Sequence, residues 1–376
     1  MKSEKKKSKV KIKALLLMLP YLAIGGLCGW SMTRYLENTE NFFGTMLLLV
    51  IWVYVAIFAQ IIIHEAGHLV FGLASGYKFS SFRIASFMIA RIDGRFCFKK
   101  LSLAGTGGQC LMNPPDMKDG KIGYVLYNLG GSLLNLITAL IFSALYFVFS
   151  DNIYLSPFFL PMALIGLAFA LMNGIPMKTD VVDNDGYNAL SLGKNKEALK
   201  SFWMQMKVGD MQLNGVRLRD MPDEWFAVPN DEDMKNSMIA ATAVFACNRL
   251  MDGKRLEDAD TLMEHILSIR SGIVGLHRAL LVGDRMYCSL VSEKYDGEMK
   301  IKLTADEEKL MKAMKNFPSV MRTEFAIALL HEKDEKKAQE IKKRFEKTAK
   351  SYPYASDIES ERELIEIAES IAAKRI

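Results

Sequence analysis

The composition excludes both a wholly soluble protein and a wholly membrane-embedded one. Of the 376 residues, 50% are hydrophobic and 24% are charged, and the formal net charge is +5. This length allows two or three domains, and the positive balance comes mostly from N-terminal lysines, which suit anionic lipid headgroups and do not indicate nucleic-acid binding.

Two unlike halves meet near Pro176. Before it the sequence consists largely of apolar stretches, whereas beyond it charged residues recur with helical periodicity. Crossing a membrane takes about 20 apolar residues, and four stretches are long enough. They are residues 14–33, 43–74, 122–150 and 156–176. We therefore expect a transmembrane domain over residues 1–190 and a cytoplasmic helical domain over residues 191–376.

The first apolar stretch follows a lysine cluster, which should stay in the cytoplasm under the positive-inside rule. A cleaved signal peptide is the alternative interpretation. However, the apolar part is longer than a usual signal-peptide core, and no clear A-x-A cleavage site follows it. We therefore expect a retained span with a cytoplasmic N-terminus.

The second stretch contains His64-Glu65-Ala66-Gly67-His68, an H-E-x-x-H motif. On a helix this spacing places two imidazoles one turn apart on one face, with a carboxylate beside them. Interfacial histidines at the end of a span are the simpler alternative, but ionisable groups within a membrane are costly and usually functional. The motif predicts a zinc site with His64 and His68 as ligands and Glu65 as the general base. Catalytic zinc takes three protein ligands, so one more must come from elsewhere.

Residues 77–103 read as strands rather than helix, with Asp93-Gly94 as the turn of a β-hairpin. An exposed strand edge near the metal could pair with an extended substrate, although a purely structural hairpin fits the pattern equally well. The basic residues of this region should be cytoplasmic. Two further spans then return the C-terminal half to the cytoplasm, which gives a multi-pass protein of the cell membrane.

The third ligand should lie where the fourth span ends, on the same side of the membrane as His68. Three carboxylates follow that end, those of Asp180, Asp183 and Asp185. In the third span, the glycines before Asn135 would let helices approach closely.

Three motifs together resemble the site-2 protease family of intramembrane zinc metallopeptidases. They are H-E-x-x-H, then Gly131-Ser132-x-x-Asn135, where Ser132 stands in place of the family's proline, then Asn173-x-x-Pro176 followed by Asp185-Gly186. The resemblance covers residues 45–190 and implies that Asp185 is the third zinc ligand, since only Asp185 precedes a glycine. The segment between Pro176 and Asp185 is longer than the usual family pattern, which keeps Asp183 and Asp180 as rivals. The resemblance also implies that Asn135 and Asn173 contact substrate.

The C-terminal half predicts successive amphipathic helices. They cover residues 195–214, 231–251, 255–270, 274–292, 304–315, 319–332, 335–349 and 357–373. Thr304 and Glu307 have the spacing of a capping box, and Gly253 marks a helix end. Two segments are weakly similar to tetratricopeptide repeats, so we expect an irregular helical solenoid that offers a surface to a protein partner.

The expected fold is an all-α polytopic membrane domain of about four transmembrane helices with a small β-hairpin insertion, plus a C-terminal α-helical solenoid-like domain. The expected function is that of an intramembrane zinc metalloprotease. It would hold one Zn²⁺ per chain and cleave membrane-embedded or membrane-associated polypeptides near the cytoplasmic face. The alternative is a membrane-anchored helical-repeat scaffold with a vestigial zinc site.

Overall fold

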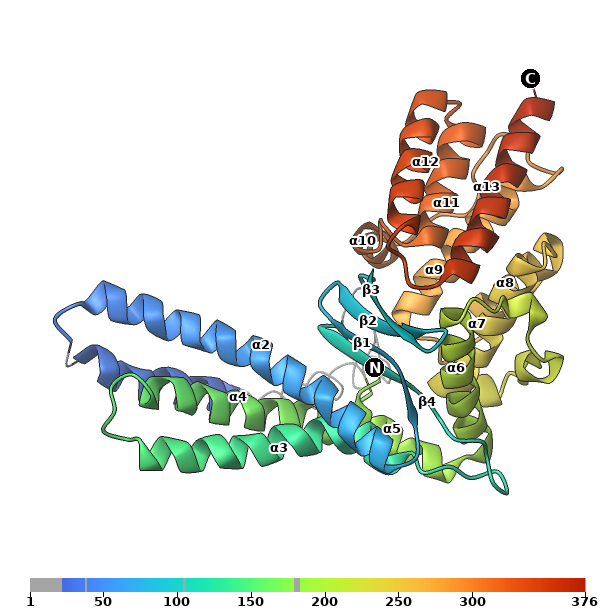
Figure 1. Ribbon diagram of the computed structural model, residues 1–376. Coiled ribbons are helices and arrows are strands. Elements are labelled where there is room, and N and C mark those ends of the chain that lie inside the picture. Colours follow the sequence, from blue (N-terminus) through green and yellow to red (C-terminus); the bar gives the residue numbers. More distant parts are fainter. Residues whose placement is uncertain (1–21, 38, 104–105, 179–182, 376) are drawn as a thin grey trace, which may run out of the picture. The chain divides into compact units, whose positions relative to one another are not determined.

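The computed structural model describes residues 22–375, apart from residue 38, residues 104–105 and residues 179–182 (Figure 1). The chain forms two compact units. The first comprises the residues up to Ser75 with Tyr124–Met177 and Asn184–Ala189, and the second comprises Gly76–Gly123, Lys178–Asp183 and Leu190–Ile376. The units are therefore divided differently from the expected boundary at residue 190, because residues 76–123 fold with the C-terminal helices.

Three helices of the first unit are long and apolar enough to cross a membrane. They are α2 (Phe42–Ala74), α3 (Val125–Val148) and α4 (Ser156–Gly174). This confirms the second, third and fourth apolar stretches as candidate spans and indicates membrane association. The stretch at 14–33 lies partly outside the described residues, which are helical from residue 22 to residue 37.

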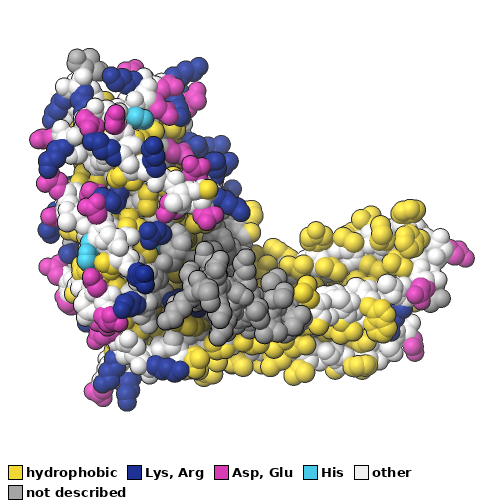
Figure 2. Space-filling view, turned by 180° about the vertical axis from the view of Figure 1, so that it is seen from behind, with side chains coloured by type: hydrophobic (Ala, Val, Ile, Leu, Met, Phe, Trp, Pro, Cys, Tyr) yellow, Lys and Arg dark blue, Asp and Glu magenta, His cyan; other side chains and the backbone are white. Residues whose placement is uncertain are grey.

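The helices of the first unit present apolar side chains outward. Figure 2 shows hydrophobic side chains over their surface, and Phe43 is 77% exposed and Tyr54 70% exposed. Inside the unit, α3 packs against both α2 and α4. Apolar side chains on the outside and polar ones within are what a lipid environment favours, because no water is present there to solvate an outward polar group.

Helix α4 ends at Gly174, followed by Ile175 in an extended conformation. The residue before a proline is disfavoured in the helical region, so Pro176 explains why the helix stops here. The short helix α5 (Asp185–Ser191) follows after residues that the structure describes only in part.

The second unit begins with a four-stranded antiparallel sheet in the order β3-β2-β1-β4. The strands are β1 (Lys78–Ile84), β2 (Phe87–Ile92), β3 (Arg95–Lys100) and β4 (Gly108–Asn113). The hairpin at Asp93-Gly94 is confirmed, with φ of +49° and +77° at these two residues. The fourth strand extends the expected hairpin to a sheet. It pairs with β1 and packs against α6 (Lys196–Leu213), a long-range contact that local patterning does not contain.

The C-terminal helices confirm all eight predicted helical segments. Besides α6 they are α7 (Ser237–Asp252), α8 (Leu256–Ser268), α9 (Gly275–Val291), α10 (Ala305–Ala313), α11 (Pro318–Ala326), α12 (Glu335–Ala349) and α13 (Ala355–Lys374). The short 3₁₀ segments are Leu192–Lys194, Leu218–Asp220, Asp223–Phe226 and Asp233–Lys235, and a π-helical turn, Ile327–His331, extends α11. The capping box of Thr304 and Glu307 is formed.

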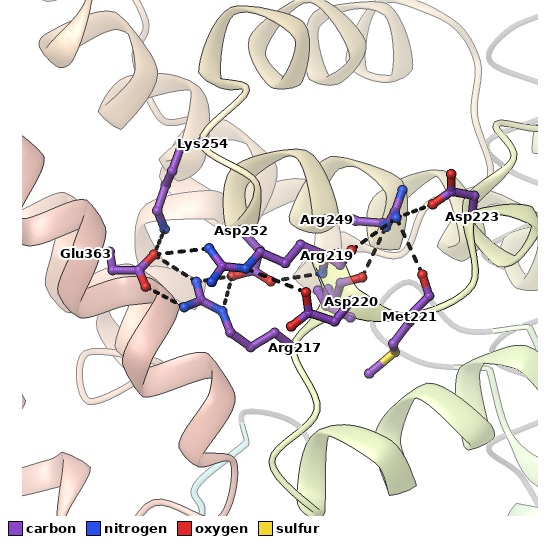
Figure 3. Close-up of polar contacts among 10 residues, drawn as sticks. Arg217, Arg219, Asp220, Met221, Asp223, Arg249, Asp252, Lys254 and Glu363 are labelled. Carbon is purple, nitrogen blue, oxygen red and sulfur yellow. Dashed lines mark hydrogen bonds and ion pairs between the residues drawn. The ribbon is translucent and has the colours of Figure 1, made fainter.

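A partly buried ionic network joins distant parts of the second unit (Figure 3). The guanidinium of Arg217 donates from Nε to Asp252 at 2.9 Å and from Nη2 to Glu363 on α13 at 2.9 Å. Lys254 also contacts Glu363, at 2.8 Å. The hydrogen bond from Arg217 lowers the pKa of Glu363 to about 2. This network ties the segment after α6 and the end of α7 to the last helix.

Candidate metal centre

His64 and His68 lie one turn apart near the C-terminal end of α2, on its buried side. Each histidine is only 8% exposed. Because α2 is continuous through the motif, the i and i+4 side chains share a face, and the two Nε2 atoms are 3.2 Å apart. Glu65 lies on the same turn and is also 8% exposed.

Asp185, the first residue of α5, reaches the same point. Its Oδ2 lies 3.0 Å from Nε2 of His64 and 3.4 Å from Nε2 of His68. Among the described residues, His64, His68 and Asp185 are the group of three side chains whose geometry could hold a metal ion.

Of the other two candidate aspartates, Asp183 does not belong to this group among the described residues. Asp183 accepts a hydrogen bond from Ser237, at the start of α7 in the second unit. Asp180 lies outside the described residues. The carboxylate that lies beside the two histidines is therefore that of Asp185, which precedes a glycine.

The far side of each imidazole is held by a hydrogen-bond acceptor. Nδ1 of His68 donates to the backbone carbonyl of Tyr127 at 2.7 Å, and Nδ1 of His64 lies 2.8 Å from Oδ1 of Asn135. In metal sites such partners fix the ring orientation and direct the other ring nitrogen toward the ion.

The direction of the His64–Asn135 bond follows from a buried chain of amides. The Gln60 amide donates to the carbonyl of Met162 at 2.8 Å, so its oxygen is the acceptor for the Asn135 amide at 2.7 Å. The Asn135 amide nitrogen is therefore a donor and its oxygen an acceptor, which makes Nδ1 of His64 the donor. Gln60 and Asn135 are both 0% exposed, and the chain links α2, α3 and α4.

Both histidines consequently direct an Nε2 lone pair toward a carboxylate oxygen. Three electron-rich atoms within 3.4 Å of one another repel unless a cation or a proton lies between them. The donor set of two imidazoles and one carboxylate is one that zinc takes in catalytic sites. The residues present therefore fit a zinc ion.

Small residues allow this close approach of α2 and α3. A β-carbon on Gly67 would overlap the backbone carbonyl of Gly130, and one on Gly131 would overlap the imidazole of His64. The expected close approach at the glycines before Asn135 is confirmed. It brings the backbone of α3 against the histidine face of α2.

Asp185 is positioned by its two neighbours. The side chain of Asn184 accepts from the backbone N–H of Tyr187, as a helix N-cap does, and donates to the carbonyls of Met172 and Ile175 at 2.8 and 2.7 Å. A β-carbon on Gly186 would overlap the carbonyl of Gly174 at the end of α4. The Asn-Asp-Gly sequence thus fastens the start of α5 to the end of α4.

The two asparagines expected to bind substrate have other partners in this structure. Asn135 engages His64 and Gln60, as described above. Asn173 lies in the last turn of α4, where its amide donates to the carbonyl of Phe169 at 3.1 Å. Their contact with substrate stays a prediction.

Two residues of the site escaped sequence reasoning, Gln60 and Asn184. Gln60 carried a usable signal, since it is a polar residue in an apolar run, one turn before His64 and on the same face. Asn184 precedes Asp-Gly in a segment that reads as an ordinary turn. Comparison with family models, with curated proteins and with solved structures finds no match to this chain.

Proposed function

We propose that this protein is an intramembrane zinc metallopeptidase that cleaves membrane-embedded or membrane-associated polypeptides. One observation carries the proposal. The three edges of the triangle formed by His64 Nε2, His68 Nε2 and Asp185 Oδ2 measure 3.2, 3.4 and 3.0 Å. Zinc–nitrogen and zinc–oxygen bonds of about 2.1 Å in a tetrahedron separate neighbouring ligand atoms by about 3.4 Å. The triangle therefore has the size of one face of a tetrahedral zinc site.

With three protein ligands, such a site leaves the fourth coordination position of the zinc open to a water molecule, as hydrolysis requires. A zinc ion bound here would act as a Lewis acid and lower the pKa of a bound water to about 7. Glu65 adjoins His64 in the same helical turn. We assign to its carboxylate the role of accepting a proton from the attacking water and passing it to the leaving amine.

The substrate class is proposed from the surroundings of the site. The motif lies in a helix with the length and composition of a transmembrane span. A substrate that reaches it within the bilayer would be helical, with its carbonyls engaged in its own hydrogen bonds, so it must unwind locally before hydrolysis. The positive-inside rule supports a cytoplasmic position for the N-terminus, the metal end of α2 and the C-terminal helices.

The zinc content of the protein is the first test. The full chain, purified in detergent, should contain one zinc per chain by elemental analysis, and His68→Ala should lose it. Glu65→Gln should keep the zinc because Glu65 is not in the ligand group. Absence of zinc from the wild-type protein, after reconstitution with zinc and dialysis, would refute the metal site.

Cleavage is tested separately. The wild-type protein and Glu65→Gln are compared on a panel of membrane-anchored reporter polypeptides in proteoliposomes, with and without a zinc chelator. We expect cleavage by the wild type that both the chelator and the Glu65 substitution abolish. Stoichiometric zinc without any Glu65-dependent cleavage would instead favour a membrane-anchored scaffold with a vestigial site.

A further inference from the structure

A pocket of about 690 Å³ opens in the second unit between α6, α7 and the segment that joins them. Its wall includes Trp203 and Trp225, whose rings meet edge to face with centroids 5.4 Å apart, and Val228, which is 47% exposed. Met204 and Ile239 also belong to the apolar part of the lining. A pocket of this size takes a few side chains of a ligand, and tryptophans are the side chains that most often carry binding energy at interfaces.

The polar part of the same lining is strongly acidic. Among the described residues that form it are four carboxylates and a single ammonium group. They are Asp116, Glu197, Glu224 and Asp233, against Lys200. An apolar floor with a negative rim is complementary to a ligand that combines an apolar side chain with positive charge.

One interaction within the chain already shows how such a cation is held. The ammonium of Lys207 lies 2.9 Å from the carboxylate of Asp116 and 5.5 Å from the centroid of the Trp203 ring. Trp203 is fixed in place because its indole N–H donates to the carbonyl of Pro115 at 3.0 Å. At the edge of this pocket a carboxylate and an indole face thus already hold an ammonium of the chain itself, which illustrates the kind of contact that a ligand cation would make with the other carboxylates.

We propose that the pocket binds a polypeptide segment in which a large apolar side chain is flanked by Lys or Arg, and that this segment lies next to the transmembrane span of another membrane protein. Cytoplasmic segments beside a span are enriched in Lys and Arg, and the span supplies apolar residues. The assignment to a membrane-protein partner rests on the function and orientation proposed above. The recognition of the segment rests only on the pocket.

Binding is tested on the full chain in nanodiscs of zwitterionic lipid, so that basic peptides have no anionic lipid to bind. The probe is a fluorescent peptide with leucines between lysines, and its anisotropy is followed. Two matched peptides carry glutamate for lysine or serine for leucine. We expect binding of the first peptide alone, weakened by added salt, because exposed charge pairs are screened.

Variants locate the binding surface. Trp225→Ala should weaken binding about 30-fold, as loss of an interfacial aromatic anchor does. Glu224→Lys should weaken it by at least about fivefold through charge reversal at the rim. Val228→Ser changes an exposed floor residue without touching the core and should weaken it as well. Glu340→Lys, an exposed position on α12, is the matched control and should leave binding unchanged.

Equal binding of the glutamate peptide, or unchanged affinity in all three pocket variants, would overturn the proposal. Glu65→Gln separates this inference from the proposed activity. If Glu65→Gln binds the peptide as the wild type does, recognition stands whatever the outcome of the cleavage experiments.

Discussion

Gly131 lies directly against the imidazole of His64, so close that a β-carbon at this position would overlap the ring. We predict that Gly131→Ala displaces His64 and weakens zinc binding about 10- to 100-fold, the effect typical of disturbing the partners of a metal ligand. Gly29→Ala is the matched control, because nothing lies within 4 Å of a β-carbon there. Competition with a zinc chelator measures the affinity. An unchanged affinity in a folded Gly131→Ala protein would contradict the close packing of α2 and α3.

Asn135 should position His64 rather than serve substrate alone. Asn135→Leu removes the acceptor of the His64 Nδ1 proton, and we expect a zinc affinity about 10- to 100-fold lower in the absence of any substrate. Asn135→Asp keeps an acceptor oxygen and should retain more of the affinity. A zinc affinity that stays at the wild-type value in Asn135→Leu, with only cleavage impaired, would assign the residue to substrate binding instead.

Matched substitutions of Asp185 and Asp183 test which of the two carboxylates is the third zinc ligand. Asp185→Asn should lower zinc affinity by at least about tenfold with the fold retained, since the neutral amide is a weaker zinc ligand than a carboxylate. Asp183→Asn should leave the affinity unchanged because its side chain contacts Ser237. For both variants, the zinc content is measured after dialysis against a buffered zinc concentration. The reverse ranking would move the ligand to Asp183.

The ionic network around Arg217 should carry part of the stability of the second unit. Asp252→Leu leaves the buried guanidinium with one partner fewer, and removing one partner of a buried pair typically costs about 3 kcal/mol. Thermal and denaturant unfolding measure the loss. The double variant Arg217→Met with Asp252→Leu should recover part of it, because no unpaired charge remains. Equal losses in the single and double variants would argue against the charge as the cause.

We expect the second unit to gain stability on mild acidification, because Asp357 becomes protonated more readily in the folded state. Burial, with the nearby charges of Glu361 and Asp252, raises its pKa to about 7 despite a hydrogen bond from Gln212. A carboxyl whose pKa is higher in the folded state than its ordinary 3.8 binds a proton on folding, so stability increases as pH falls from about 8 toward 5. We expect a gain of about 1 kcal/mol, reduced by solvent screening.

Asp357→Asn is the control for this pH effect. The amide oxygen can still accept from Gln212, and the variant should be more stable than the wild type at pH 8 and less dependent on pH. Burial raises the pKa of Asp284 to about 6, so it should contribute in the same direction and leave a residual slope. A wild-type unfolding midpoint that falls steadily between pH 8 and pH 5.5 would refute the prediction.

Local pattern alone predicted the C-terminal helices, three apolar spans and one hairpin of this protein, and the arrangement of the two histidines of its motif. Periodicity and capping signals located the C-terminal helices, and the spacing of His64 and His68 placed both rings on one face of α2. These features depend on residues within one or two helical turns, so the sequence contains them directly.

The tertiary structure decided what lies far apart in the chain. Among the described residues, it brought Asp185 and not Asp183 to the two histidines, since the start of α5, which Asn184 and Gly186 fasten to α4, reaches the end of α2. It directed the side-chain oxygen of Asn135 to His64, because the Asn135 amide nitrogen donates to Gln60. It also added β4 to the predicted hairpin. These contacts arise where helices and strands pack, and the free energy that fixes them comes from burial and from buried hydrogen bonds between distant segments, which no local pattern records.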